Sequence, residues 1–212
     1  MLSFMFKKKE DNMTPLENKC LYLAEKLHDG VVYGGGLVML DQIKGTHALL
    51  ERNSMLDGVE KENALCAALL HKCWESKRIA PEQTPLTMDE VEKYTNPAVR
   101  QIVEELASEP EEDKNQTKTQ QWQVKAKWAK QLSPAAQEIL LAEKIQNFEV
   151  SRDKPNPAKP LAWHQEYFQT RMLMVEAIKT TNDLLYRQAL QTKNEGMAVI
   201  QVLMAEKKKE RS

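Results

Sequence analysis

Histidine is the residue type of this chain that is best suited to metal binding and to proton transfer near neutral pH. The chain has four histidines, which are His28, His47, His71 and His164. Cysteine offers less, because the three cysteines are odd in number and lack the pair spacing of a metal site. We therefore expect Cys20, Cys66 and Cys73 to be reduced, buried thiols of a cytosolic protein.

Two further patterns could be connected with phosphate or nucleic-acid chemistry. The glycine run at residues 34–36 lacks the Lys-Ser/Thr that completes a phosphate-binding loop. Trp122, Lys125 and Trp128 stand at helical spacing, a pattern that can stack on nucleic acid. In the alternative interpretation the indoles pack on the core while Lys125, Lys127 and Lys130 stay in water. The formal net charge of −1 favours this alternative, since it indicates neither nucleic acid nor an anionic membrane as partner.

The elements that must position these side chains are helices, and several helix starts are legible. Thr14–Glu17 and Thr87–Glu90 are capping boxes, and Asn96-Pro97 and Ser133-Pro134 each pair a capping side chain with a proline. Together with the apolar spacing, these signals predict helices at Pro15–His28, Leu40–Arg52, Val59–Lys77, Met88–Lys93, Pro97–Ser108, Lys118–Lys130, Pro134–Phe148, Trp163–Thr180 and Asp183–Glu206. The third is apolar nearly all round at Ala64–His71, which predicts a central position in the core.

Three segments between these helices are expected to be irregular. Val31–Met39 surrounds the glycines and is predicted to be a mobile loop. Glu109–Thr117 is polar and acidic and is predicted to be a flexible surface loop, and Ser151–Pro160 is expected to be an extended, proline-rich connector. We expect a flexible segment at residues 1–13, one helical domain at 14–206 and a basic tail at 207–212. The pattern of the first residues does not match a secretory signal, and no apolar run is long enough to span a bilayer.

Three separated segments carry a family resemblance. Ala67–His71 is similar to the start of the pattern A-A-L-L-H-D, Leu141–Asn147 looks like L-A-D-K-L-x-N, and His164–Phe168 resembles a segment E-Y-F that opens a late helix. In this order and rough spacing they resemble the HD-type hydrolases of the RelA/SpoT family, in particular the small stand-alone alarmone hydrolases that act on ppGpp. The resemblance covers about Leu16 to Gln191 and implies an all-α HD-domain helical bundle.

The resemblance also implies a metal site, and this chain departs from it. The family holds a divalent ion, usually manganese, with two His and two Asp, and the ion activates a water that attacks the 3′-pyrophosphate of ppGpp. The corresponding positions are here Gln42, His71, Lys72 and Glu143. Glu75 matches the first of two acids that orient the water and would be catalytic in an active enzyme, whereas Ser76 replaces the second. His47 would be a ligand only if the register near Gln42 shifted.

Lys72 argues against the family's metal chemistry. An ammonium has no lone pair for a metal at neutral pH, and it repels a dication a few ångströms away by roughly several kcal/mol. We therefore expect no metal cofactor, and Mn²⁺ only if the site is functional. Two placements of Lys72 stay open. Its ammonium could pair with Glu143 where the metal would have bridged, or it could point into solvent at the end of its helix.

By the same resemblance, four positions would contact a guanosine nucleotide. Asn147 matches an asparagine beside the pyrophosphate, and Tyr167 matches a tyrosine that lines the pocket. Lys118 falls near a lysine that contacts phosphate. Tyr33 could stack on a base, but it stands where the family has an arginine, and Trp163 replaces another arginine. The structural alternatives are that Asn147 braces helices and that Tyr167 lies at the edge of the core.

Two functional hypotheses follow from the sequence. In the first, the protein is a non-catalytic HD-domain homologue, a pseudoenzyme that binds a guanosine nucleotide or a protein partner. In the second, it is an active (p)ppGpp 3′-pyrophosphohydrolase, or another phosphohydrolase, with an atypical metal site. Under both hypotheses we expect a cytoplasmic protein whose partners include neither nucleic acid nor membrane. The sequence predicts no oligomeric state.

Overall fold

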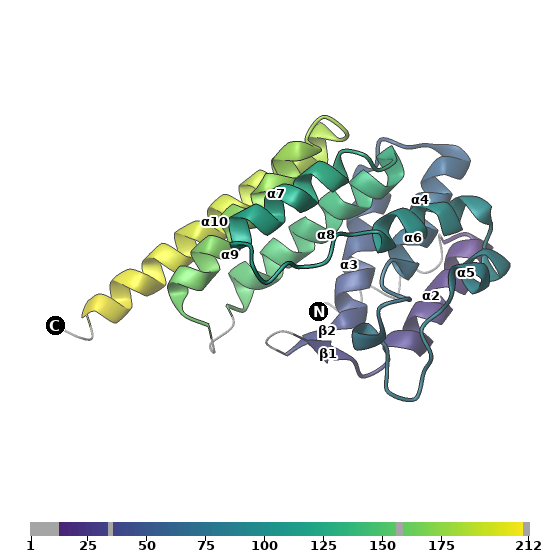
Figure 1. Ribbon diagram of the computed structural model, residues 1–212, viewed down its shortest axis with the longest axis horizontal. Helices are drawn as coiled ribbons and strands as arrows, with labels where there is room; N and C mark the ends of the chain where they lie inside the picture. Colours follow the sequence, from purple (N-terminus) through teal and green to yellow (C-terminus); the bar gives the residue numbers. More distant parts are fainter. Residues whose placement is uncertain (1–12, 34–35, 156–158, 210–212) are drawn as a thin grey trace.

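The chain folds into a bundle of α-helices with one short β-hairpin (Figure 1). The computed structural model describes residues 13–33, 36–155 and 159–209. Within these ranges the α-helices are α2 (Pro15–His28), α3 (Met39–Asn53), α4 (Gly58–Leu70), α5 (Met88–Tyr94), α6 (Pro97–Ala107), α7 (Lys118–Ala129), α8 (Pro134–Asp153), α9 (Leu161–Ala177) and α10 (Asp183–Lys209). The strands are β1 (Val32–Tyr33) and β2 (Leu37–Val38), and a 3-10 helix, η2, spans Ser76–Arg78. None of the described helices combines the length and the apolarity needed to cross a bilayer.

The helix starts form where the capping residues predict them. Thr14 and Thr87 each accept the amide of a glutamate three residues on, and each glutamate accepts the threonine amide in return. The side chains of Asn96 and Ser133 cap α6 and α8. Thr117 makes a further capping box with Gln120 at the start of α7. Because these caps satisfy free amides at the helix starts, they fix the first turns locally.

Helix α4 ends at Leu70, so the prediction that it continues to Lys77 was wrong. The Cys73 amide donates to the Leu70 carbonyl at 2.9 Å and closes a tight turn, and the Trp74 indole donates to the His71 carbonyl at 3.2 Å. These bonds satisfy carbonyl groups at the end of the helix and turn the chain away from its axis. Lys72 therefore lies on a turn instead of a helix.

The segment Val31–Met39, predicted as a loop, contains a β-hairpin on either side of residues 34 and 35, which lie outside the described residues. β1 and β2 form an antiparallel hairpin, with Val32 opposite Val38, and the Met39 amide donates to the Val31 carbonyl at 2.9 Å. Gly36, at φ +87°, supports the turn with a backbone conformation that favours glycine. The start of the predicted connector Ser151–Pro160 also differs, since α8 continues to Asp153, and residues 156–158 of this segment lie outside the described residues. Residues 1–12, in the predicted N-terminal segment, and residues 210–212, in the predicted tail, lie outside the described residues.

Helices α3 and α4 join two groups of helices. α4 packs against α2, α3 and α6, while α3 packs along α8. α10 lies along α8 and α9, and α7 packs against α9, so that α7–α10 run side by side away from the α2–α6 group (Figure 1). The fully buried side chains Leu50, Leu69, Leu70, Ile139 and Leu141 form the core where the two groups meet. The three cysteines are unpaired and buried, which confirms the prediction of buried thiols.

Candidate functional site

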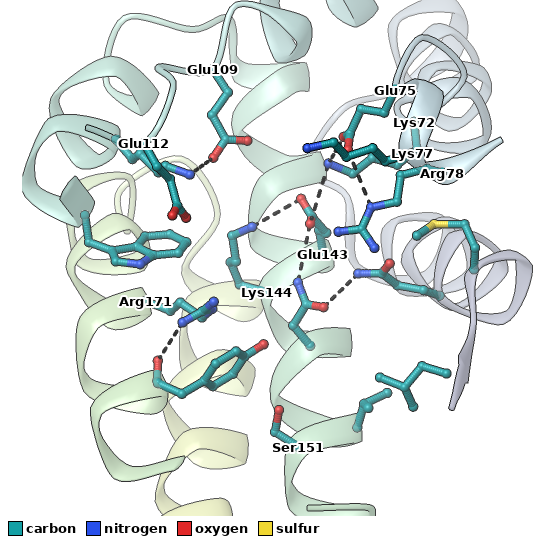
Figure 2. A pocket seen from close by; sticks show the side chains of 18 of the residues that line it. Lys72, Glu75, Lys77, Arg78, Glu109, Glu112, Glu143, Lys144, Ser151 and Arg171 are labelled. Atoms are coloured by element: carbon teal, nitrogen blue, oxygen red, sulfur yellow. Dashed lines mark hydrogen bonds and ion pairs between the residues drawn. The ribbon is translucent and has the colours of Figure 1, made fainter. Parts of the chain in front are cut away.

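A pocket of about 650 Å³ opens between α8, α9 and the turn that follows α4. Six of the nine positions selected from the sequence line it, namely Gln42, Lys72, Glu75, Glu143, Asn147 and Tyr167. Gln42 comes from α3, Lys72 and Glu75 from the turn, and the others from α8 and α9. Figure 2 shows Glu143 near the middle of the pocket, with Lys72 and Glu75 to one side of it. The structure thus assembles most of these positions from distant parts of the sequence.

His71, which caps the end of α4, is buried beside this pocket and does not line it. Its Nδ1–H donates to the Ala68 carbonyl at 2.6 Å, and its Nε2 has no hydrogen-bond partner in the described part of the chain. Burial, together with the charge of Lys72, lowers the pKa of His71 to about 4, so the imidazole is neutral at neutral pH. A neutral ring with a free Nε2 lone pair is the form in which histidine binds a metal.

Lys72 lies between two carboxylates. Its Nζ is 2.8 Å from Glu75 Oε1 and 3.9 Å from Glu143 Oε1, and its side chain is only 14% exposed. The alternative in which Lys72 points into solvent is therefore wrong, and its closer partner is Glu75. Burial alone would lower the pKa of Lys72, but the charges of Glu143, Glu75 and Glu109 together raise it above its ordinary value. The side chain is accordingly a fixed ammonium ion.

Both carboxylate oxygens of Glu143 already face positive or hydrogen-bond-donating groups. Oε2 lies 3.2 Å from the ammonium of Lys144, and Oε1 accepts the Asn147 side-chain amide at 3.3 Å. Burial alone would raise the pKa of Glu143, but the charges of Lys144, Lys72 and His71 hold it far below its usual range. Glu143 is thus a carboxylate whose charge the protein neutralises with its own lysines.

These residues do not fit the divalent ion that the resemblance implies. Across the described ranges, no three His, Cys, Asp or Glu side chains gather in a way that could hold a metal. Of the four positions that match the family's ligands, only His71 and Glu143 offer the donor types that such ions prefer, and Gln42 offers only its neutral amide oxygen, on a side chain whose Nε2 donates to Asn147 at 2.7 Å. An ion placed at Glu143 would also meet the ammonium of Lys72 at close range.

The four positions selected for nucleotide contact are not all at the pocket. Asn147 links Gln42 to Glu143 on the pocket wall, and Tyr167 lies against the guanidinium of Arg171. Lys118 is outside the lining, where its ammonium pairs with Glu112 at 2.9 Å on the surface. The side chain of Tyr33 lies outside the described residues.

No family model matches this chain. The chain is 33% identical over 132 residues to the guanosine-3′,5′-bis(diphosphate) 3′-pyrophosphohydrolase MESH1 of Mus musculus, covering 60% of this chain and 65% of that protein. The Homo sapiens protein of the same name is 33% identical over 129 residues, covering 59% of this chain and 64% of that protein. The aligned part therefore spans less than two thirds of the length of these relatives.

A solved structure shares the architecture more completely. It is described as a metazoan ortholog of SpoT that hydrolyzes ppGpp, and it superposes with a TM-score of 0.69 over 86% of this chain and 96% of that chain. The chain has the all-α HD-domain fold. The fold class predicted from the sequence is thereby confirmed, and the sequence identity in this comparison is 21%.

Three pocket residues were missed or misinterpreted from the sequence. Arg171 and Lys144 line the wall made by α8 and α9, and neither was selected as a site residue. Trp122 and Trp128 are buried, as the structural interpretation of the basic-aromatic stripe predicted. Lys125 was wrongly placed in water, because its side chain is 12% exposed and pairs with Glu109 at 2.6 Å. The spacing of Arg171 one helical turn after Tyr167 was the available signal.

Proposed function

We propose that this protein binds a guanosine nucleotide in the pocket between α8 and α9 and does not perform the metal-dependent hydrolysis that the family resemblance implies. The observation that carries the proposal is the position of Lys72, 2.8 Å from Glu75 and 3.9 Å from Glu143. These are the two carboxylates that would orient the water and hold the ion. A fixed ammonium between them neutralises their charge but supplies neither an open coordination site nor an activated water.

The lining of the pocket supports an anionic ligand with an aromatic base. Among the described residues, eight basic and five acidic side chains line it, so positive charge is in excess. Trp122, Trp163 and Tyr167 add aromatic rings, on which a purine base can stack. The names of the MESH1 relatives specify guanosine-3′,5′-bis(diphosphate), and the guanosine nucleotide proposed here is taken from that similarity.

The proposal is tested by measuring binding and hydrolysis of ppGpp separately. We expect calorimetry to show ppGpp binding without manganese, and we expect no pyrophosphate release when manganese is added. The variant Lys72→Asp/Gln42→His restores two donors of the metal site, and we expect manganese-dependent release in it. Lys77→Asp is the matched control, because it makes the same charge change at a lining lysine outside the Lys72–Glu143 contact.

One observation favours the second candidate, an active hydrolase with an atypical site. The buried Nε2 of His71 has no hydrogen-bond partner among the described residues. The carboxylate of Glu143, the other position with a metal-binding side chain, is near enough to raise the pKa of His71 against the effect of burial. Pyrophosphate release by the unmodified protein with manganese would establish this candidate and refute the first. Stoichiometric manganese, iron or zinc in the purified protein would likewise refute the first candidate, the binding protein without a metal.

A further inference from the structure

Three cationic side chains surround the indole of Trp122 on one wall of the pocket. The Nζ atoms of Lys125 and Lys144 lie 5.2 Å and 5.7 Å from the ring centroid, and the guanidinium carbon of Arg171 lies 4.8 Å from it. We refer to these four residues, which come from α7, α8 and α9, as the Trp122 cluster. Trp122 and Lys144 are buried and Lys125 is nearly so, which keeps these charges partly out of water.

Carboxylates neutralise only part of this charge. Glu109 pairs with Lys125 at 2.6 Å, and Glu143 pairs with Lys144 at 3.2 Å. Glu143 is shared, because its other oxygen lies 3.9 Å from Lys72. Arg171 forms no ion pair within the part of the chain that the structure describes. Glu112 also acts on Arg171 and Lys125, but it pairs with Lys118 at 2.9 Å, so the Trp122 cluster keeps an excess of positive charge at the surface of the pocket.

The surroundings of Arg171 orient its guanidinium. Its central carbon lies 3.5 Å from the centroid of the Tyr167 ring, and Nη1 donates weakly to the Tyr167 carbonyl at 3.5 Å. Stacking on aromatic rings occupies the face of a guanidinium and leaves N–H groups along its edge for an acceptor. Burial lowers the pKa of Arg171, although Tyr167, Glu112 and Glu143 oppose this effect, so the charge sits in an unfavourable environment. A bound anion would relieve that cost.

We infer that the Trp122 cluster is an anion subsite that holds a phosphate or pyrophosphate group, with Arg171 as its anchor. Three cations around one ring suit a multiply charged anion better than a single carboxylate, and an arginine edge matches phosphate oxygens in pairs. The inference rests on the proposed function, because it names the part of the same pocket that holds the phosphates of the nucleotide.

The subsite lies apart from Lys72, Lys77 and Arg78, the other cations of the pocket that Figure 2 labels. Figure 2 shows Arg171 and Lys144 on one side of Glu143, and Lys72, Lys77 and Arg78 on the other. A phosphate bound at Arg171 is therefore separated by the Glu143 carboxylate from the ammonium of Lys72. This placement gives the pocket two basic walls, and the inference assigns the anchoring of a phosphate to the wall made by α7, α8 and α9.

The test is a calorimetric titration of the folded protein with inorganic pyrophosphate and, separately, with ppGpp. We expect Arg171→Gln to weaken pyrophosphate binding by roughly tenfold or more, because a charge-assisted hydrogen-bond donor is removed. We expect Glu109→Gln to strengthen it several-fold, because Lys125 is released from its carboxylate. Lys127→Gln is the matched control, an exposed lysine two residues along the same helix, and we expect no change.

The outcomes separate this inference from the proposed function. If ppGpp binds and Arg171→Gln, folded as judged by its thermal melt, binds pyrophosphate like the wild type, the subsite is refuted and the nucleotide function stands. If pyrophosphate binding depends on Arg171 while ppGpp does not bind, the subsite stands and the nucleotide function is refuted. Equal weakening by Lys127→Gln would also refute the subsite. The opposite effect of Glu109→Gln keeps the inference testable if Arg171→Gln does not fold.

Discussion

Lys72 is the residue on which the proposed absence of metal chemistry in this pocket depends. A metal ion would give Glu143 two positive charges and a bound water, whereas an ammonium gives one positive charge and three donors. The lysine compensates for the buried carboxylate of Glu143 and shares the role with Lys144. Removing one partner of such a group leaves an uncompensated buried charge, which is strongly destabilising. The contact between Lys72 and Glu143 is thereby suited to holding α8 against the turn after α4.

His28 should make the stability of the protein depend on pH. Its side chain is fully buried, Nδ1–H donates to the Arg78 carbonyl at 2.6 Å, and Nε2 has no hydrogen-bond partner in the described structure. Burial lowers the pKa of His28 below its ordinary value, partly offset by the Arg78 carbonyl and the charge of Glu75. Below a pH of about 6.5 the unfolded chain takes up a proton that the folded protein does not, so stability falls as the pH falls.

The measurement is the free energy of unfolding in urea at about pH 7.5 and about pH 5.5. We expect the wild type to lose more stability over this interval than His28→Asn, by up to about 1.4 kcal/mol per pH unit. Asparagine retains an N–H donor for the Arg78 carbonyl but does not titrate. If both proteins showed the same pH dependence, protonation of His28 would not be linked to folding.

Among the secondary-structure elements, helix starts could be predicted and some other boundaries could not. The capping boxes at Thr14 and Thr87 are local, so their residues alone define them. The end of α4 depends on Trp74 and on the Leu86 amide, which donates to the Cys73 carbonyl from a later loop. The β-hairpin likewise depends on pairing across the glycine turn. Such bonds depend on particular side chains and turns, and they leave no periodic signal in the sequence.

The candidate site, like the element boundaries, could be predicted from the sequence only in part. Motif resemblance selected Lys72, Glu143 and Asn147, which the fold brings to one pocket. It did not select Arg171, whose role depends on α7 packing against α9 and bringing Trp122 over its guanidinium. Nor could it place Lys118, which lies outside the pocket lining and pairs with Glu112 of the acidic loop. Which charged side chains lie beside one another depends on how the helices pack, so the structure is needed to identify them.

The contact between α9 and α10 requires a glycine. A Cβ atom at Gly196 would lie 2.4 Å from Cζ of Phe168, a fully buried ring that also packs on Phe148. Gly196→Ala should gain up to about 1 kcal/mol from helix propensity but lose about 1–3 kcal/mol through overpacking. Because the buried ring has no free space, we expect a net loss of about 1–2 kcal/mol in the free energy of unfolding, measured in urea.

Gly45 in α3 offers the same substitution in a different environment. A Cβ atom there would meet the end of the Gln146 side chain, which is half-buried and flexible. Gln146 can rotate away at the cost of its hydrogen bond to Glu149, so Gly45→Ala should change stability by less than about 1 kcal/mol. A loss at Gly45 equal to that at Gly196 would show that helix packing against Phe168 is not the cause.

In the molecule as a whole, one buried carboxylate connects the two groups of helices. Glu138 of α8 is 1% exposed and accepts hydrogen bonds from the Ser54 hydroxyl and, at 2.9 Å, from the Met55 amide in the connection between α3 and α4. It also accepts the side-chain amide of Asn182 at 2.8 Å, and Asn182 caps α10 through its Oδ1. The position of α10 is thus linked to that of α3 and α4 through a single side chain.

Loss of this carboxylate should destabilise the whole molecule and not only α8. In Glu138→Ala the Met55 and Asn182 donors lose a buried acceptor, and at about 1–3 kcal/mol for each unsatisfied group we expect a loss of about 3 kcal/mol or more. Urea unfolding followed by tryptophan fluorescence and by circular dichroism measures this loss. Glu166→Ala, at an exposed position of α9, is the control and should stay within about 0.5 kcal/mol of the wild type. Equal effects of the two substitutions would mean that the helix groups are held together by apolar packing alone, whereas separate transitions in Glu138→Ala would show that this carboxylate couples them.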